Sequence, residues 1–102
     1  EEVRVFYLDR KNHLIADEQH SRGTVDHAPF YPREVIKRAL EMSASALVVV
    51  HNHPSGDPTP STGDIALTRQ LGEASKMMGL TLHDHIIITP SGEVSFRAEG
   101  LI

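Results

Sequence analysis

The sequence predicts one α/β (α+β) domain in which a mixed β-sheet is flanked by helices. The length of 102 residues and the mass of 11.3 kDa suit a single hydrophobic core. Short apolar segments typical of strands alternate with two longer segments in which apolar residues recur at helical spacing. Strands arranged around two helices, with one central buried strand, indicate a domain of two or three layers.

The first part of the chain predicts a hairpin followed by a helix. Residues 3–8 alternate as a strand does, residues 9–13 indicate a turn, and residues 14 to about 21 can pair back as a second strand. Residues 22–24 would close this hairpin. Pro32 is placed to begin a helix of about three turns, which should cover one face of the sheet. The apolar positions of this helix are Val35, Ile36, Ala39, Leu40 and Met42.

The middle of the chain predicts a strand, a loop and a second helix. Residues 46–50 are a continuous apolar run rich in valine, which predicts a central strand buried on both faces. Residues 52–60 contain three prolines and a glycine and therefore form a loop. Ser61 opens a long helical pattern that Gly79 is placed to end. The apolar positions of this helix are Leu67, Leu71, Ala74 and Met78.

The last part of the chain predicts a second hairpin. Residues 82–89 and 92–97 have strand character and flank a Pro-Ser-Gly turn. They complete the sheet.

Composition excludes several classes of protein. No apolar run approaches the roughly 18 to 20 residues that span a bilayer, and no basic start followed by an apolar stretch suggests a signal peptide. The chain has no cysteine, which excludes disulfide scaffolds, thiolate zinc fingers and cysteine nucleophiles, and we expect a cytoplasmic protein. Ten basic residues against 14 acidic ones, without a basic block, argue against strong nucleic-acid binding by this segment. Any transition metal must be held by histidine and carboxylate.

Two histidines end the central strand and predict a metal site. Residues two apart on an extended backbone point to the same face, so His51 and His53 can present two imidazoles to one point. Asp64 falls in the first turn of the following helix, where its carboxylate can turn back toward this pair. Two histidines, one carboxylate and a water make an open tetrahedral zinc site of the catalytic type.

Each part of this pattern also has a plainer interpretation. Ser61 and Asp64 fit a helix cap, in which the serine accepts a backbone N–H and the aspartate favours the positive end of the helix dipole. A His-x-His pair alone can be two hydrogen-bonded histidines at a strand end. The combination favours a functional cleft, because a polar His-Asn-His is an unusual continuation of a buried valine run.

The segment HNHPSGDPTPSTGD resembles the JAMM motif of the JAB/MPN metalloproteases, and its wording is similar to that of the RadC branch. The similarity extends over nearly the whole chain, through YLDRKN, RGTVD, PREVIKRAL, DIALTRQL and HDHIIIT. It implies an MPN/JAB-like fold with cytidine-deaminase-like layering. It also implies Zn²⁺ held by His51, His53 and Asp64, with Ser61 polarising the scissile carbonyl or stabilising the oxyanion.

The resemblance further requires an upstream glutamate as general base. In the superfamily this residue stands at the start of the first strand, which points to Glu1, with Glu2 as the next choice. Glu18 is a third candidate, although an exposed strand carboxylate is the better interpretation of it. Because the chain does not begin with methionine, we expect residues 1–102 to be a single MPN (JAMM) domain from the C-terminal part of a longer RadC-like protein.

Other polar residues receive structural interpretations. His83 and His85 could furnish a second metal site, but their place in an apolar hairpin favours hydrogen-bonded roles. His85 is the better candidate for a residue that orients the metal ligands without binding the ion itself. Asp57 is expected to bond turn amides. The remaining histidines are expected at the surface: His13, His20 and His27.

The leading functional hypothesis is a zinc-dependent metallohydrolase, a peptidase or isopeptidase, in a protein whose family name suggests DNA repair. The alternative is a non-catalytic metal-binding module with a regulatory or scaffolding role in that context. A nuclease of the HNH type is disfavoured, because those enzymes spread the three residues over a ββα hairpin, and deaminase chemistry fails without its cysteine ligands. The expected partner is a peptide or protein substrate, with no membrane; the natural substrate and the oligomeric state stay open.

Overall fold

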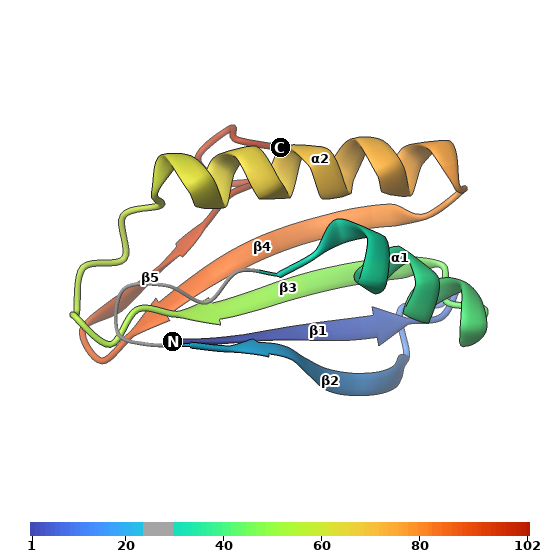
Figure 1. The fold of residues 1–102 in the computed structure, drawn as a ribbon, viewed down its shortest axis with the longest axis horizontal. Helices are drawn as coiled ribbons and strands as arrows, with labels where there is room; N and C mark the ends of the chain where they lie inside the picture. The colour runs from blue at the N-terminus through green and yellow to red at the C-terminus, as the bar shows by residue number, and fades with distance from the viewer. Residues whose placement is uncertain (24–29) are drawn as a thin grey trace.

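The computed structural model describes residues 1–23 and 30–102. Within these residues, five strands form one mixed sheet in the order β2-β1-β3-β4-β5, and two helices lie on one of its faces (Figure 1). The strands are β1 (Glu2–Leu8), β2 (Leu14–Arg22), β3 (Ala46–Asn52), β4 (Thr81–Thr89) and β5 (Gly92–Ser95). The helices are α1 (Pro32–Glu41) and α2 (Thr62–Met77). The predicted mixed sheet with flanking helices is confirmed, in its two-layer form.

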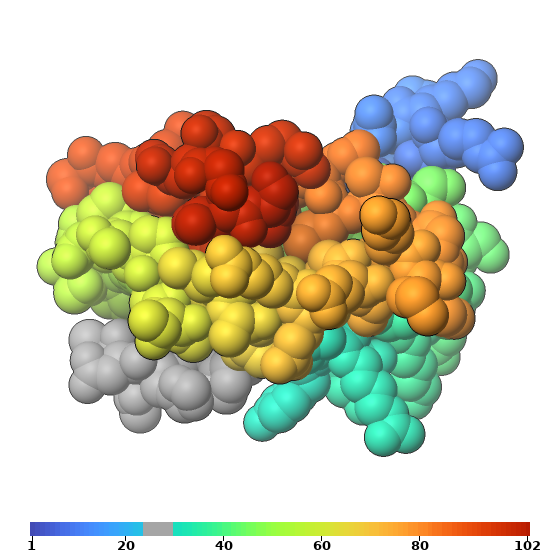
Figure 2. Space-filling view, turned by 90° about the horizontal axis from the view of Figure 1, so that it is seen from above, coloured from blue at the N-terminus to red at the C-terminus, as the bar shows by residue number. Residues whose placement is uncertain are grey.

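The sheet is mixed because one connection crosses over it. β1 pairs antiparallel with both β2 and β3, and β4 pairs antiparallel with β5. β3 and β4 are parallel, so the chain must return along the sheet between them, and α2 makes this return. Figure 2 shows α2 lying between α1 on one side and the C-terminal residues on the other.

The core lies between the sheet and the helices. On β1, Val3, Val5 and Tyr7 are fully buried, as strand alternation predicts. The central position of β3 is confirmed, but the prediction of burial on both faces is wrong for Val48 and Val50. Both are only half-buried, because they lie on the face opposite to the helices.

Both helices begin where the sequence predicts. Pro32 occupies the first turn of α1, and Ser61 caps the start of α2. After α2, Gly79 has a φ of +74°, a left-handed conformation that glycine adopts without strain. Two residues assigned to the apolar faces are corrected: Leu40 and Met78 are 45% and 51% exposed, at the ends of their helices. Within the described residues, neither helix is long and apolar enough to cross a membrane.

Replacing Leu71 by alanine is expected to lower the free energy of unfolding by about 2–5 kcal/mol. The Leu71 side chain is fully buried in the core, so its removal leaves a cavity under α2. Urea unfolding followed by circular dichroism measures the loss. Leu40→Ala is the matched control and should lower the free energy of unfolding by less than about 1 kcal/mol, because the Leu40 side chain is largely exposed to solvent. Equal losses would contradict the placement of Leu40.

Candidate metal centre

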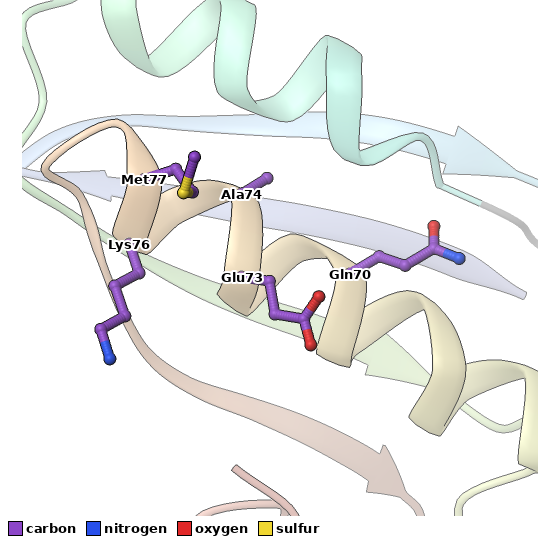
Figure 3. A pocket seen from close by; sticks show the side chains of 5 residues that line it. All are labelled: Gln70, Glu73, Ala74, Lys76 and Met77. Carbon is purple, nitrogen blue, oxygen red and sulfur yellow. The ribbon is translucent and has the colours of Figure 1, made fainter.

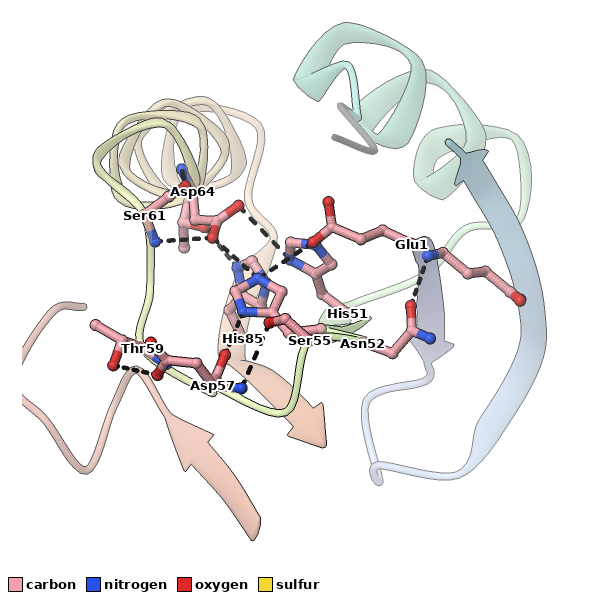
Figure 4. Close-up of polar contacts among 12 residues, drawn as sticks. Glu1, His51, Asn52, Ser55, Asp57, Thr59, Ser61, Asp64 and His85 are labelled. Carbon is pink, nitrogen blue, oxygen red and sulfur yellow. Dashed lines mark hydrogen bonds and ion pairs between the residues drawn. The ribbon is translucent and has the colours of Figure 1, made fainter. Parts of the chain in front are cut away.

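The predicted motif residues gather at one edge of the sheet, where β3 ends and α2 begins (Figure 4). β1 starts at the same edge, because it runs antiparallel to β3 with Val3 opposite His51. Glu1 stands directly before β1 and therefore lies beside the histidines. Asn52 strengthens this junction, since its Oδ1 accepts a hydrogen bond from the Glu2 backbone N–H at 2.6 Å. Sequence reasoning missed Asn52, although it lies between the two motif histidines.

The two imidazoles face the same point, as the strand pattern predicts. The rings of His51 and His53 have centroids 4.7 Å apart and stand nearly perpendicular to each other. His53 Nδ1 lies 2.9 Å from the backbone carbonyl oxygen of Asp57. A carbonyl can only accept, so Nδ1 carries the proton and donates it. The lone pair of His53 is thereby assigned to Nε2, the nitrogen that faces the carboxylates.

Two carboxylates lie beside the imidazoles, one from directly before β1 and one from the first turn of α2. Glu1 Oε1 is 3.1 Å from His51 Nε2 and 3.3 Å from His53 Nε2. Asp64 Oδ1 is 3.6 Å from His51 Nδ1, and Asp64 Oδ2 is 3.4 Å from His53 Nε2. The ligand atoms of Glu1, His51 and His53 all lie within 4.8 Å of one another, a grouping that could hold a metal ion. Asp64, the carboxylate predicted as the third ligand, is not a member of this group but contacts the same two histidines.

Ser61 and Asp64 form a capping box at the start of α2. Ser61 Oγ accepts a hydrogen bond from the Asp64 backbone N–H at 3.0 Å, and Asp64 Oδ2 accepts one from the Ser61 backbone N–H at 2.9 Å. The helix-cap interpretation is therefore confirmed. It is compatible with a ligand role, because the same Asp64 carboxylate reaches His53. The cap holds this carboxylate in a fixed orientation toward the centre.

The charge of the cluster suits a cation. Burial lowers the pKa of His51, against the opposing effect of Asp64 and Glu1, and favours the neutral imidazole. Two carboxylates, those of Glu1 and Asp64, lie against this imidazole and bring negative charge to the cluster. His51 Nδ1 is buried and has no hydrogen-bond partner among the described residues. Imidazole and carboxylate donors, an unsatisfied ring nitrogen and negative charge together fit a divalent transition-metal ion.

His85 lies behind this cluster, on β4. It is fully buried, and its ring stacks on Phe96 with centroids 4.2 Å apart and packs 5.6 Å from the ring of His51. Its Nδ1 shares a hydrogen bond of 2.6 Å with Thr68 Oγ1. Burial lowers the pKa of His85 to about 3, so the ring is neutral near pH 7.

Residues 1–101 match the family model of the RadC-like JAB domain. The chain belongs to this family. It is 66% identical over 102 residues to a UPF0758 protein of Rhodobacter capsulatus and 68% identical over 102 residues to a UPF0758 protein of Ruegeria pomeroyi. All of this chain is covered in both comparisons, against 48% and 46% of the two relatives. The JAB domain described here therefore spans about half the length of these curated relatives.

Of the three candidate bases in this JAB domain, Glu1 is the one that contacts the motif histidines. The Glu2 carboxylate pairs with Arg4 Nη1 at 2.8 Å. Glu18 receives two hydrogen bonds of 2.9 Å from the Arg38 guanidinium, which lowers its pKa. Neither carboxylate is placed to serve the centre.

His83 and His85 do not form a pair in the JAB domain. A register shift sets Leu47 opposite Leu82 but Val48 opposite Asp84, so His83 is skipped in the pairing with β3. His83 Nε2 lies 2.8 Å from Asn12 Oδ1, whereas His85 bonds Thr68, so the two histidines have separate partners.

Among the described residues, the other polar side chains singled out from the sequence are not members of the ion-binding group. Asp57 Oδ1 accepts hydrogen bonds from the Thr59 backbone N–H and hydroxyl at 3.0 and 2.7 Å, as the turn interpretation predicts. His13 is exposed beside Asp9. The surface assignment of His20 is wrong: it is half-buried and its Nε2 contacts the Tyr7 hydroxyl. His27 lies outside the described residues.

A pocket of about 750 Å³ lies along the second half of α2, away from the capped end that carries Asp64 (Figure 3). Figure 3 shows Met77 and Ala74 on the side of α2 that faces α1. The pocket is lined by Gln70, Glu73, Ala74, Lys76 and Met77. It shares no residue with the candidate metal centre.

Proposed function

We propose that this JAB domain is a zinc-dependent hydrolase that cleaves peptide or isopeptide bonds. The observation that supports it best is the convergence of His51, His53, Glu1 and Asp64 at one buried point on the sheet edge. Two histidines with one carboxylate already make the three-ligand set of a catalytic zinc site, which leaves the second carboxylate outside the ligand set. One can hold the ion and the other can take up a proton.

His51, His53 and Asp64 would hold the ion. When bound, a divalent ion lowers the pKa of a coordinated water to about 7 and polarises a carbonyl oxygen. Asp64 suits a ligand because the backbone N–H of Ser61 already fixes its carboxylate. The His53 Nδ1–H bond to the Asp57 carbonyl orients that ring in the same way, as bonds behind metal ligands commonly do.

Glu1 would act as the general base. Its Oε1 lies within 3.3 Å of both histidine Nε2 atoms, so a proton removed from a water held between these groups has a short path to this carboxylate. The Glu1 side chain is 8% exposed, which shields the proton transfer from bulk water.

Ser61 would stabilise negative charge on the substrate carbonyl. Its Oγ accepts the Asp64 N–H, and this bond leaves the hydroxyl proton available for donation to another group. Ser61 is exposed, and this proton can be donated to an oxygen that gains charge during the reaction.

Ser61→Ala is expected to leave zinc content unchanged and to lower kcat by about 10²-fold, the usual cost of losing one donor to an oxyanion. Loss of the cap should also cost about 1 kcal/mol of stability. Elemental analysis and turnover of the best substrate from a peptide screen measure the two effects. Thr62→Ala is the control, an exposed neighbouring hydroxyl outside the capping box. Full activity in Ser61→Ala would remove the assigned role.

The proposed activity is tested by removing the metal with a chelator and restoring zinc. The zinc-loaded protein should cleave members of a library of peptide and isopeptide substrates. This activity should be lost on chelation and regained when zinc is added. Zinc bound at about one ion per chain without cleavage of any substrate would favour the alternative, a metal-binding module with a regulatory or scaffolding role.

A further inference from the structure

Thr68 connects the start of α2 to the sheet beneath it. Residues four apart on a helix lie on the same face, so Thr68 lies one turn after Asp64 on the same face of α2. Along α2, Thr68 is the first fully buried residue; the residues between the cap and Thr68 are exposed or half-buried. Its hydroxyl reaches His85 Nδ1 at 2.6 Å.

His85 is fixed on the other side of this bond. Phe96 stacks on the ring at 4.2 Å with an interplanar angle of 13°, and Phe30 packs edge-on with its ring centroid 6.1 Å away. The ring of His51 lies 5.6 Å from it. The Thr68–His85 bond therefore ties α2 to β4 immediately behind a motif histidine.

A polar residue at this place needs an explanation. Phenylalanine could fill similar space and stack on Phe96, whereas His85 leaves its Nε2 buried without a hydrogen-bond partner among the described residues. An unsatisfied buried nitrogen destabilises the fold. The compensating interaction is the one that Nδ1 makes with α2.

We propose that the Thr68–His85 hydrogen bond positions Asp64 against His51 and His53. The segment between His53 and Ser61 has no helix or strand, whereas the Thr68–His85 bond joins α2 directly to the sheet. Asp64 moves with α2, whereas His51 belongs to the end of β3 and His53 follows directly after that strand. Anchoring α2 one turn beyond Asp64 sets the separation between the carboxylate and the imidazoles, and with it the affinity of the centre for a metal ion. This inference rests on the proposed metal-binding function.

The test is Thr68→Val, which keeps the side-chain shape and removes the hydroxyl. Zinc affinity, measured by competition with a chromophoric chelator, should fall about 10- to 100-fold, as for other groups that orient metal ligands. Thr68→Ser retains the hydroxyl and should bind zinc within about threefold of the unmodified protein. In the metal-free protein, amide hydrogen exchange over residues 62–68 should be faster in Thr68→Val and not in Thr68→Ser.

His85→Phe gives a second, independent comparison if valine at position 68 prevents folding. It keeps the stack on Phe96 and should weaken zinc binding to a similar degree. Combining His85→Phe with Thr68→Val should add little, because both variants remove the same bond.

The outcomes separate this inference from the proposed function. Unchanged zinc affinity and unchanged exchange in both Thr68→Val and His85→Phe would overturn the positioning role and leave the metal centre standing. Failure of the unmodified protein to bind zinc would overturn the metal centre. In that case faster exchange of residues 62–68 in Thr68→Val would still support the anchoring of α2, and unchanged exchange would refute it.

Discussion

Replacing His51 and His53 together by alanine is expected to reduce bound zinc from about one ion per chain to none. The two rings would supply both nitrogen ligands of the proposed centre, and we expect the carboxylates of Glu1 and Asp64 alone to bind zinc weakly. The measurement is elemental analysis of protein that was purified without a metal-affinity step, loaded with zinc and dialysed.

The control is a protein that loses two histidines elsewhere. His13 is exposed, and His83 bonds Asn12, so His13→Ala with His83→Ala removes equally many imidazoles without touching the centre. This control should keep its zinc. Circular dichroism must show that both double variants are folded, since His51 is buried. Zinc retained after loss of His51 and His53 would place the ion elsewhere, and loss in both double variants would indicate non-specific binding by histidines.

The relations within the motif could be predicted because they are local. Strand alternation puts His51 and His53 on one side, and the Ser61 cap fixes Asp64 in the first turn of α2. Each depends on only a few neighbouring backbone conformations, which periodicity and capping residues reveal. The elements themselves were predicted for the same reason.

Glu1 could not be placed by such reasoning. It lies 50 residues before His51, and their contact depends on which strands pair and in what register. Periodicity identifies strands but not their neighbours, so the resemblance to a family was needed to point to Glu1. The Thr68–His85 bond could not be predicted from the sequence for the same reason, because its two partners lie on a helix and on a strand that pack across the core.

The predictions of burial failed where the layer arrangement decides exposure. Val48 and Val50 belong to a uniformly apolar segment, and only the placement of both helices on one side leaves them half-buried. His20 shows the reverse: this polar residue on an edge strand is half-buried, with its ring 5.9 Å from the ring of Tyr7 on the neighbouring strand and its Nε2 against the Tyr7 hydroxyl. Residue type alone distinguishes neither case.

Glu1→Gln is expected to keep zinc and to lower kcat by about 10²- to 10⁴-fold, whereas Asp64→Asn is expected to lose most of its zinc. Glutamine retains the shape of Glu1 and an oxygen at the end of its side chain, but it cannot take up a proton at neutral pH. Asparagine removes the negative charge of the carboxylate that the capping box aims at the histidines. Zinc content and turnover, measured on the same preparations, separate the base from the ligand.

The geometry makes this comparison decisive, because both carboxylates contact both histidines. Glu2→Gln is the matched control, since its carboxylate pairs with Arg4 and should affect neither quantity. The opposite pattern, with zinc lost in Glu1→Gln and kept in Asp64→Asn, would make Glu1 the third ligand of the grouping it forms with His51 and His53. Asp64, held by the backbone at the start of α2, would then be the carboxylate left to accept the proton.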